Sequence, residues 1–163
     1  MSANLFEPDW DGESDRPGFE YRRAKLGAQA GGERLGASLY EIPPGQATFP
    51  YHAHFGNEEM LIVLAGRPSL RTPAGWRELE TGELVACRVG PEGAHQLMNR
   101  TEEPARVLVL SEMNAPEVSV YPDSGKVLAG TRPPGAPETA DDVFEAFRLE
   151  DAADYWEDEE PPE

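Results

Sequence analysis

In its most informative stretch the chain reads Gly45-Gln-Ala-Thr-Phe-Pro-Tyr-His52-Ala-His54-Phe-Gly-Asn-Glu-Glu59-Met-Leu-Ile-Val-Leu-Ala-Gly66. Side chains alternate between the two faces of a strand, so His52 and His54 point the same way, about 7 Å apart along the strand. Residues 55–57 predict a turn. After this turn the chain returns, and Glu59 can lie on the next strand beside both imidazoles.

His95 is the only other histidine of the chain, and it lies 41 residues beyond His54. It can reach the same point only if the sheet closes, because a barrel gathers inward-facing side chains from separated strands. A His-x-His pair in a strand also occurs without any metal. Here the returning glutamate and the later Gly-x-His favour one divalent metal held by His52, His54, Glu59 and His95.

The rest of the chain alternates between short strands and turns. Glycine and proline number 16 each, which favours many short strands over long helices. Residues 59–65 are apolar on both faces and predict a central strand, and Pro73-Ala74-Gly75 marks a hairpin. The predicted strands cover residues 19–26, 37–42, 48–54, 59–65, 69–72, 76–79, 84–89, 95–98, 106–110 and 118–121. This spacing predicts an all-β sandwich or barrel.

In the stretch quoted above the chain resembles the cupin superfamily, and in particular its small single-domain bacterial members of unassigned activity. The first cupin motif has a glycine, a His-x-His pair, a glutamate and a second glycine. Residues 45–66 are similar to it, with four residues between His54 and Glu59 and six between Glu59 and Gly66. This spacing assigns the ligand position of the motif to Glu59 rather than Glu58.

The second cupin motif is matched more loosely. Gly82, His95 and Asn99 fit it, but Arg88 stands where the family usually has proline. The resemblance covers residues 35–120 and implies a single cupin-type double-stranded β-helix, or jelly-roll, barrel. We expect Asn99 to stabilise a turn.

The ends of the chain differ in composition from the middle. We expect an irregular N-terminal arm at residues 1–17, the barrel at 18–129, and a C-terminal part at 130–163. This last part begins with a Gly/Pro-rich linker at 130–137, continues with a short helix capped by Thr139, and ends in an acidic tail. In that helix Val143, Phe144 and Phe147 would share one face.

The ligand set suits manganese, iron, nickel or zinc, because it contains imidazoles and a carboxylate but no thiolate. Open positions on such an ion can bind a small organic ligand. The residues near the motifs that we expect to line the pocket are Phe49, Met60, Leu61, Val63 and Met98. Tyr51 is expected to face the other way, Arg88 to form a salt bridge or an anion clamp, and Cys87 to be buried as a small hydrophobe.

The charge of the chain excludes some partners. The formal net charge is −17, and the segment from Glu138 to the end contains most of it. Such a chain repels nucleic acid and anionic membranes. A lone cysteine and the lack of a signal peptide or long apolar run predict a cytoplasmic protein. We also expect a homodimer, formed through the strand at 19–26 and the arm that contains Trp10.

Three functions stay open at this point. The first is a metal-dependent enzyme acting on a small organic molecule, dioxygenase-like or isomerase-like. The second is a non-catalytic module that binds a small molecule or sugar, since no further catalytic group stands out beside the ligands. The third is an interaction protein that acts through its acidic tail.

Overall fold

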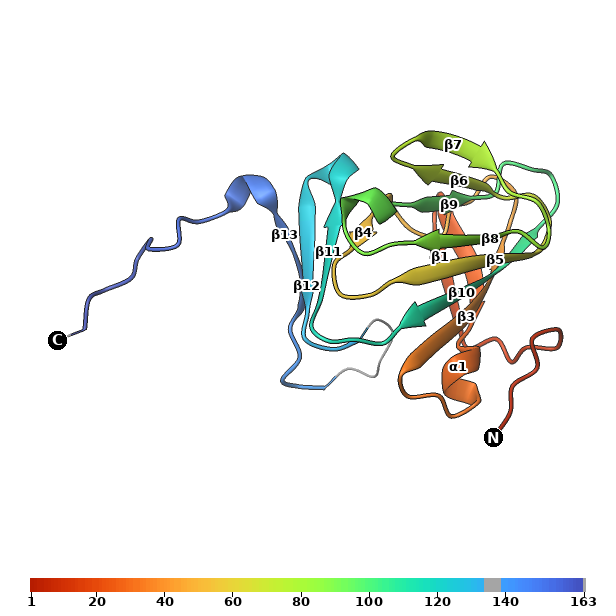
Figure 1. Ribbon diagram of the computed structural model, residues 1–163, viewed down its shortest axis with the longest axis horizontal. Coiled ribbons are helices and arrows are strands. Elements are labelled where there is room, and N and C mark those ends of the chain that lie inside the picture. Colours follow the sequence, from red (N-terminus) through yellow and green to blue (C-terminus); the bar gives the residue numbers. More distant parts are fainter. Residues whose placement is uncertain (134–138, 163) are drawn as a thin grey trace.

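The structure is a computed structural model, and it describes residues 1–133 and 139–162. Three antiparallel sheets build the molecule (Figure 1). Their strand orders are β1-β2-β3-β10-β5-β8, β13-β12-β11-β4 and β7-β6-β9. The strands are β1 (Gly12–Arg16), β2 (Phe19–Ala24), β3 (Leu35–Ile42), β4 (Ala53–His54), β5 (Glu59–Ala65), β6 (Ser69–Thr72), β7 (Gly75–Glu78), β8 (Leu84–Cys87), β9 (Gln96–Met98), β10 (Ala105–Glu112), β11 (Glu117–Tyr121), β12 (Lys126–Gly130) and β13 (Phe144–Arg148). The one short α-helix described is α1 (Leu26–Gln29).

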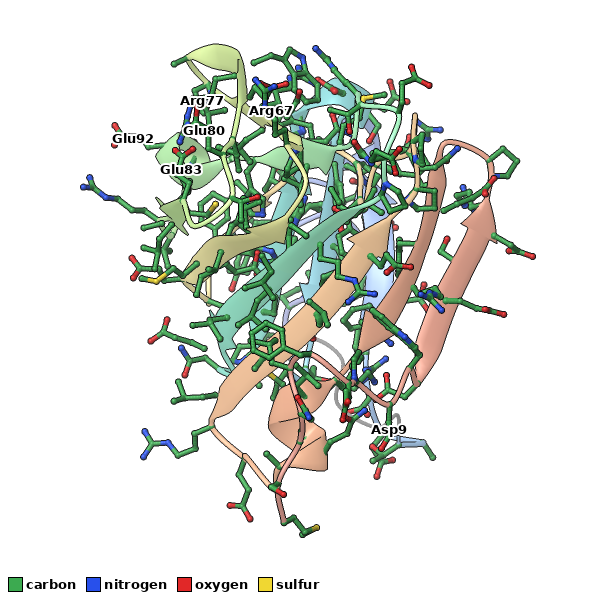
Figure 2. The ribbon with its side chains drawn as sticks, turned by 90° about the vertical axis from the view of Figure 1, so that its right-hand side faces the viewer. Asp9, Arg67, Arg77, Glu80, Glu83 and Glu92 are labelled. Atoms are coloured by element: carbon green, nitrogen blue, oxygen red, sulfur yellow. The ribbon has the colours of Figure 1, made fainter. Side chains whose placement is uncertain are left out.

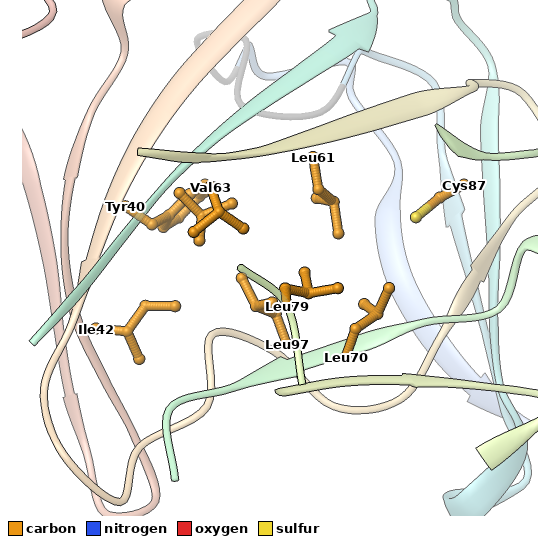
Figure 3. Packing of buried hydrophobic residues seen from close by; sticks show 9 residues of the cluster. Tyr40, Ile42, Leu61, Val63, Leu70, Leu79, Cys87 and Leu97 are labelled. Atoms are coloured by element: carbon orange, nitrogen blue, oxygen red, sulfur yellow. The ribbon is translucent and has the colours of Figure 1, made fainter. Parts of the chain in front are cut away.

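The predicted all-β jelly-roll fold is confirmed. The three-stranded sheet lies over the six-stranded sheet, and the four-stranded sheet stands beside one end of both (Figure 1). The main core lies between the three-stranded and the six-stranded sheet (Figure 3). There Ile42 and Val63 of the six-stranded sheet meet Leu70 and Leu97 of the three-stranded sheet, and each is at most 3% exposed.

The strands predicted between residues 19 and 121 form within a few residues of their expected bounds, with one exception. Of the strand predicted at 48–54, only Ala53 and His54 belong to a ladder, where they pair with β11. The rest bends at Thr48, Phe49 and Tyr51, with isolated bridges at Ala47, just before the predicted strand, and at His52. Pro50 accounts for this difference, because proline has no N–H group to donate to a ladder.

The N-terminal arm is irregular only to Asp11, and Gly12–Arg16 then forms strand β1 along β2. Both edges of β2 are therefore paired within the chain, with β1 and β3. Trp10 packs on the barrel beside Leu39 and Ala24. The predicted homodimer through β2 and the Trp10 arm stays a prediction, because only one chain is described and both segments pair or pack within it. The domain boundary predicted after residue 17 stays a prediction.

The predicted C-terminal helix is wrong. Residues 144–148 form strand β13, which pairs in full with β12. Asp142 does accept a hydrogen bond from the Thr139 backbone N–H, as a capping box requires. A helix this short is marginal by itself, however, and pairing with the edge of β12 prevails. Only a 3₁₀ turn, Leu149–Asp151, follows. Residues 134–137 of the predicted linker lie outside the described residues.

Several exposed arginines pair with nearby carboxylates. At one corner of the molecule, Arg77 Nη1 lies 2.5 Å from Glu83 Oε1 (Figure 2). Arg67 pairs with Glu78. Such exposed pairs add little to stability. In the described part of the chain, no helix has the length and apolar character needed to cross a membrane.

Candidate metal centre

The backbone brings the two predicted motifs together directly. His52 and His95 form an isolated antiparallel bridge, in which His52 N donates to His95 O at 3.1 Å and His95 N donates to His52 O at 2.8 Å. His54 follows on β4, and Glu59 is the first residue of β5. The closure of the barrel that the sequence analysis required is therefore present.

The four predicted residues form one cluster, which we call the ligand cluster: His52, His54, Glu59 and His95. One potential ligand atom from each lies within 4.8 Å of all the others. Nε2 of His52 lies 3.1 Å from Nε2 of His54, and Nε2 of His95 lies 3.1 Å from Oε2 of Glu59. Ligands about 2.1 Å from a common ion lie roughly 3–4 Å from one another. The cluster therefore fits one divalent ion with little adjustment.

The other ring nitrogen of each histidine has a hydrogen-bond acceptor. Nδ1 of His52 lies 2.8 Å from the Pro50 carbonyl oxygen, and Nδ1 of His95 lies 3.0 Å from the Gly93 carbonyl oxygen. A carbonyl can only accept, so both Nδ1 atoms carry the proton. In the neutral imidazoles, the lone pairs of the Nε2 atoms then point into the cluster, which is the arrangement that metal-binding histidines use.

His54 is oriented by a residue that the sequence analysis missed. Its Nδ1 lies 3.1 Å from Oε1 of Glu117 and 3.2 Å from the Ser119 hydroxyl. Glu117 is 1% exposed and also accepts from the Asn57 amide. The alternation of β11 was the available signal, because Glu117, Ser119 and Tyr121 are the polar residues of one face and Val118 and Val120 lie between them.

Burial and neighbouring side chains shift the pKa values of the cluster residues in different directions. Burial, followed by His95 and His54, lowers the pKa of His52 to about 3. Burial alone would lower the pKa of His95, but the Cys87 and Glu59 side chains raise it to about 10. Burial would raise the pKa of Glu59, yet hydrogen bonding to His95 and the nearby imidazoles hold it below its usual value. Glu59 is thus a mostly buried carboxylate, with 14% of its side chain exposed, that is stabilised by a positive partner.

A cavity of about 440 Å³ opens in front of the cluster, and all four ligand residues line it. Of the predicted pocket residues, Phe49 and Leu61 line this cavity. Met60, Val63 and Met98 do not. Met60 and Met98 alternate away from the inward-facing Leu61 and Leu97, and Val63 is buried in the core beside the cavity.

Three further residues named from the sequence lie outside the cavity wall. Tyr51 is buried away from the cavity, with the Arg71 guanidinium 4.0 Å from its ring centre. Arg88 is exposed. Cys87 is 5% exposed and packs in the core next to His95. Asn99 stabilises a turn, as expected, since its amide donates to the Ile42 and Glu103 carbonyls.

The comparison with protein families decides the assignment. Residues 38–111 match the family model described as a cupin domain, and this range includes the whole ligand cluster. The chain contains a cupin domain. Among curated proteins, no match to the chain was found.

Solved structures with the same fold include other cupins. A putative sugar phosphate isomerase from Acidithiobacillus ferrooxidans is 24% identical with a TM-score of 0.74, and the match covers 90% of this chain and 88% of that one. A sugar phosphate isomerase of the cupin superfamily from Silicibacter pomeroyi is 26% identical with a TM-score of 0.71, covering 88% and 99%. A predicted oxalate decarboxylase from Thermotoga maritima is 18% identical with a TM-score of 0.58, covering 69% and 98%. The cupin domain of this chain therefore has the same fold as proteins named for different reactions.

Proposed function

We propose that this cupin domain binds one divalent transition metal through the ligand cluster and acts on a small hydroxylated molecule, in an isomerase-like reaction. The observation that supports this most directly is the convergence of three imidazoles and one carboxylate within 4.8 Å at the wall of a cavity. The donor set suits manganese, iron, nickel or zinc. When bound, the metal acts as a Lewis acid that polarises a carbonyl or hydroxyl oxygen of the substrate.

The cavity wall favours a hydroxylated ligand. Residues with hydroxyl groups line it: Ser38, Tyr40, Thr48, Ser111, Ser119 and Tyr121. The pKa of Tyr40 is raised to about 12 by burial, so its hydroxyl stays protonated and can donate a hydrogen bond at neutral pH. Tyr121 stacks on His52, with ring centres 5.8 Å apart. These groups bind and orient a substrate, whereas Glu58, which lies next to the ligand Glu59, is exposed and outside the cavity wall.

The name of the Silicibacter pomeroyi structure supports testing sugar phosphates first. Purified protein loaded with each metal in turn would be incubated with a panel of aldose and ketose phosphates, and the products followed by proton NMR. We expect interconversion of aldose and ketose without oxygen consumption, and its loss in a His54→Ala variant. Oxygen-dependent turnover would favour the dioxygenase-like alternative. Tight binding without turnover would favour a non-catalytic binding module.

The homodimer and the cytoplasmic location stay predictions from the sequence. For the dimer, light scattering coupled to size-exclusion chromatography gives the mass directly, and a mass near 17.9 kDa would contradict it.

A further inference from the structure

Arg23 reaches the same cavity from the six-stranded sheet. It lies on β2, opposite Gly12 of β1 and Tyr40 of β3, and it lines the cavity together with Tyr40. A Cβ atom at Gly12 would lie 3.0 Å from Arg23 Nη2 and 3.3 Å from Nε. The side chain of Arg23 therefore runs close along the backbone of β1, and glycine at position 12 leaves room for it.

The charge of Arg23 lacks a carboxylate partner among the described residues. Its Nε is buried without any hydrogen-bond acceptor, and Tyr40 lies opposite it on β3. The adjacent Arg22 faces outward and pairs with Glu41. A chain with 31 acidic residues and 14 basic ones thus pairs the outward arginine and leaves the inward one facing the cavity. A buried donor without an acceptor is costly unless a ligand supplies one.

Arg23 and the ligand cluster lie at different ends of the cavity. Strands β3 and β10 lie between β2, which contains Arg23, and β5, which begins with Glu59. Three strand spacings of roughly 4.8 Å separate the two backbones. Ser38 on β3 and Ser111 on β10 line the cavity on these two intervening strands. A ligand that reaches both ends therefore has a metal-binding end, a hydroxylated middle and a second end at the guanidinium.

We propose that Arg23 is an anion-binding residue for this ligand. The guanidinium binds the phosphate or carboxylate at one end of a small polyhydroxylated molecule, while a carbonyl or hydroxyl at the other end reaches the metal. A planar guanidinium can bind either anion through two parallel hydrogen bonds. This inference rests on the proposed function, because the position of the ligand is defined by the metal at its far end.

The test uses three six-carbon probes that differ in one group: glucose, glucuronate and glucose 6-phosphate. Binding to the metal-loaded full chain would be measured by calorimetry. We expect at least one anionic probe to bind about tenfold or more tightly than glucose, and Arg23→Gln to abolish that preference. The probe that gains most distinguishes phosphate from carboxylate. Arg22→Gln is the matched control, because it removes the same charge from the outer face of the same strand, and it should keep the preference.

A second variant, Gly12→Ala, tests the position of Arg23 while its charge is retained. Its new methyl group displaces the guanidinium, so we expect part of the anionic preference to be lost while the metal content is unchanged. If the wild-type chain holds no metal, the proposed function fails. If it holds metal but binds neither anionic probe better than glucose, or if Arg23→Gln discriminates as well as wild type, the inference about Arg23 is overturned.

Discussion

The two ends of the cavity are built in different ways. At the metal end, three of the four ligands come from residues 52–59, and His95 joins them through a direct backbone bridge to His52. At the arginine end, Arg23 is placed only by the pairing of β1, β2 and β3. The metal end is therefore encoded mainly in local spacing, and the arginine end mainly in strand register. One end of a cavity can therefore be predicted from sequence spacing, while the other end can be recognised only once the pairing of the strands is known.

The largest expected effect concerns the metal end. Glu59→Gln keeps the shape of the side chain but removes its charge, so we expect metal affinity to fall by more than about 100-fold, beyond the loss typical of outer hydrogen-bond partners. A competition titration with a coloured chelator measures it. Glu58→Gln is the matched control, because the same change on the adjacent, exposed residue should leave affinity unchanged. Equal losses in both variants would mean that general charge, not ligation, attracts the ion.

A smaller effect on metal affinity is expected at Glu117, which strand pairing places beside the ligand His54. Glu117 lies on β11, 63 positions from His54 along the chain, yet its carboxylate accepts from the His54 ring. We expect Glu117→Gln to lower metal affinity by roughly 10–100-fold, because the amide orients and polarises the imidazole less well. The same chelator titration applies. An unchanged affinity would show that His54 is held by the strand pairing alone.

Glu117 and Arg23 mark the limit of what the sequence could predict. The His52-x-His54 spacing, the returning Glu59 and the later His95 predicted the ligand cluster, and the strand-and-turn pattern predicted most of the barrel. Glu117 and Arg23 were not predicted, because their inward orientation depends on which strands pair and in what register. The segment after Thr139, with Val143, Phe144 and Phe147, was wrongly predicted as helix for the same reason, since its partner β12 is visible only in the fold.

The smallest expected effect lies on the outer face of the arginine end. Burial alone would raise the pKa of Glu41, but the guanidinium groups of Arg22 and Arg106 hold it below its usual value. A lowered pKa means that the folded state favours the charged carboxylate. Its contribution is therefore present at neutral pH and is lost as the pH falls through the folded-state pKa.

We expect Glu41→Gln to lower the free energy of unfolding by about 1 kcal/mol at pH 7, as for a partly exposed charge network. Urea unfolding at a series of pH values measures the difference between variant and wild type. That difference should shrink as the pH drops below about 4. A difference that stays constant with pH would show that packing, not charge, accounts for the role of Glu41. Metal affinity should be unaffected, since Glu41 faces away from the cavity that Tyr40 lines.

The most direct test of the metal centre is an anomalous difference map from crystals of the metal-loaded chain, collected on both sides of the absorption edge of the metal. We expect one peak per chain, bonded to the Nε2 atoms of the three histidines and to a Glu59 carboxylate oxygen at about 2.0–2.2 Å. Loaded crystals without a peak at this point, or with the metal bound elsewhere, would contradict the account.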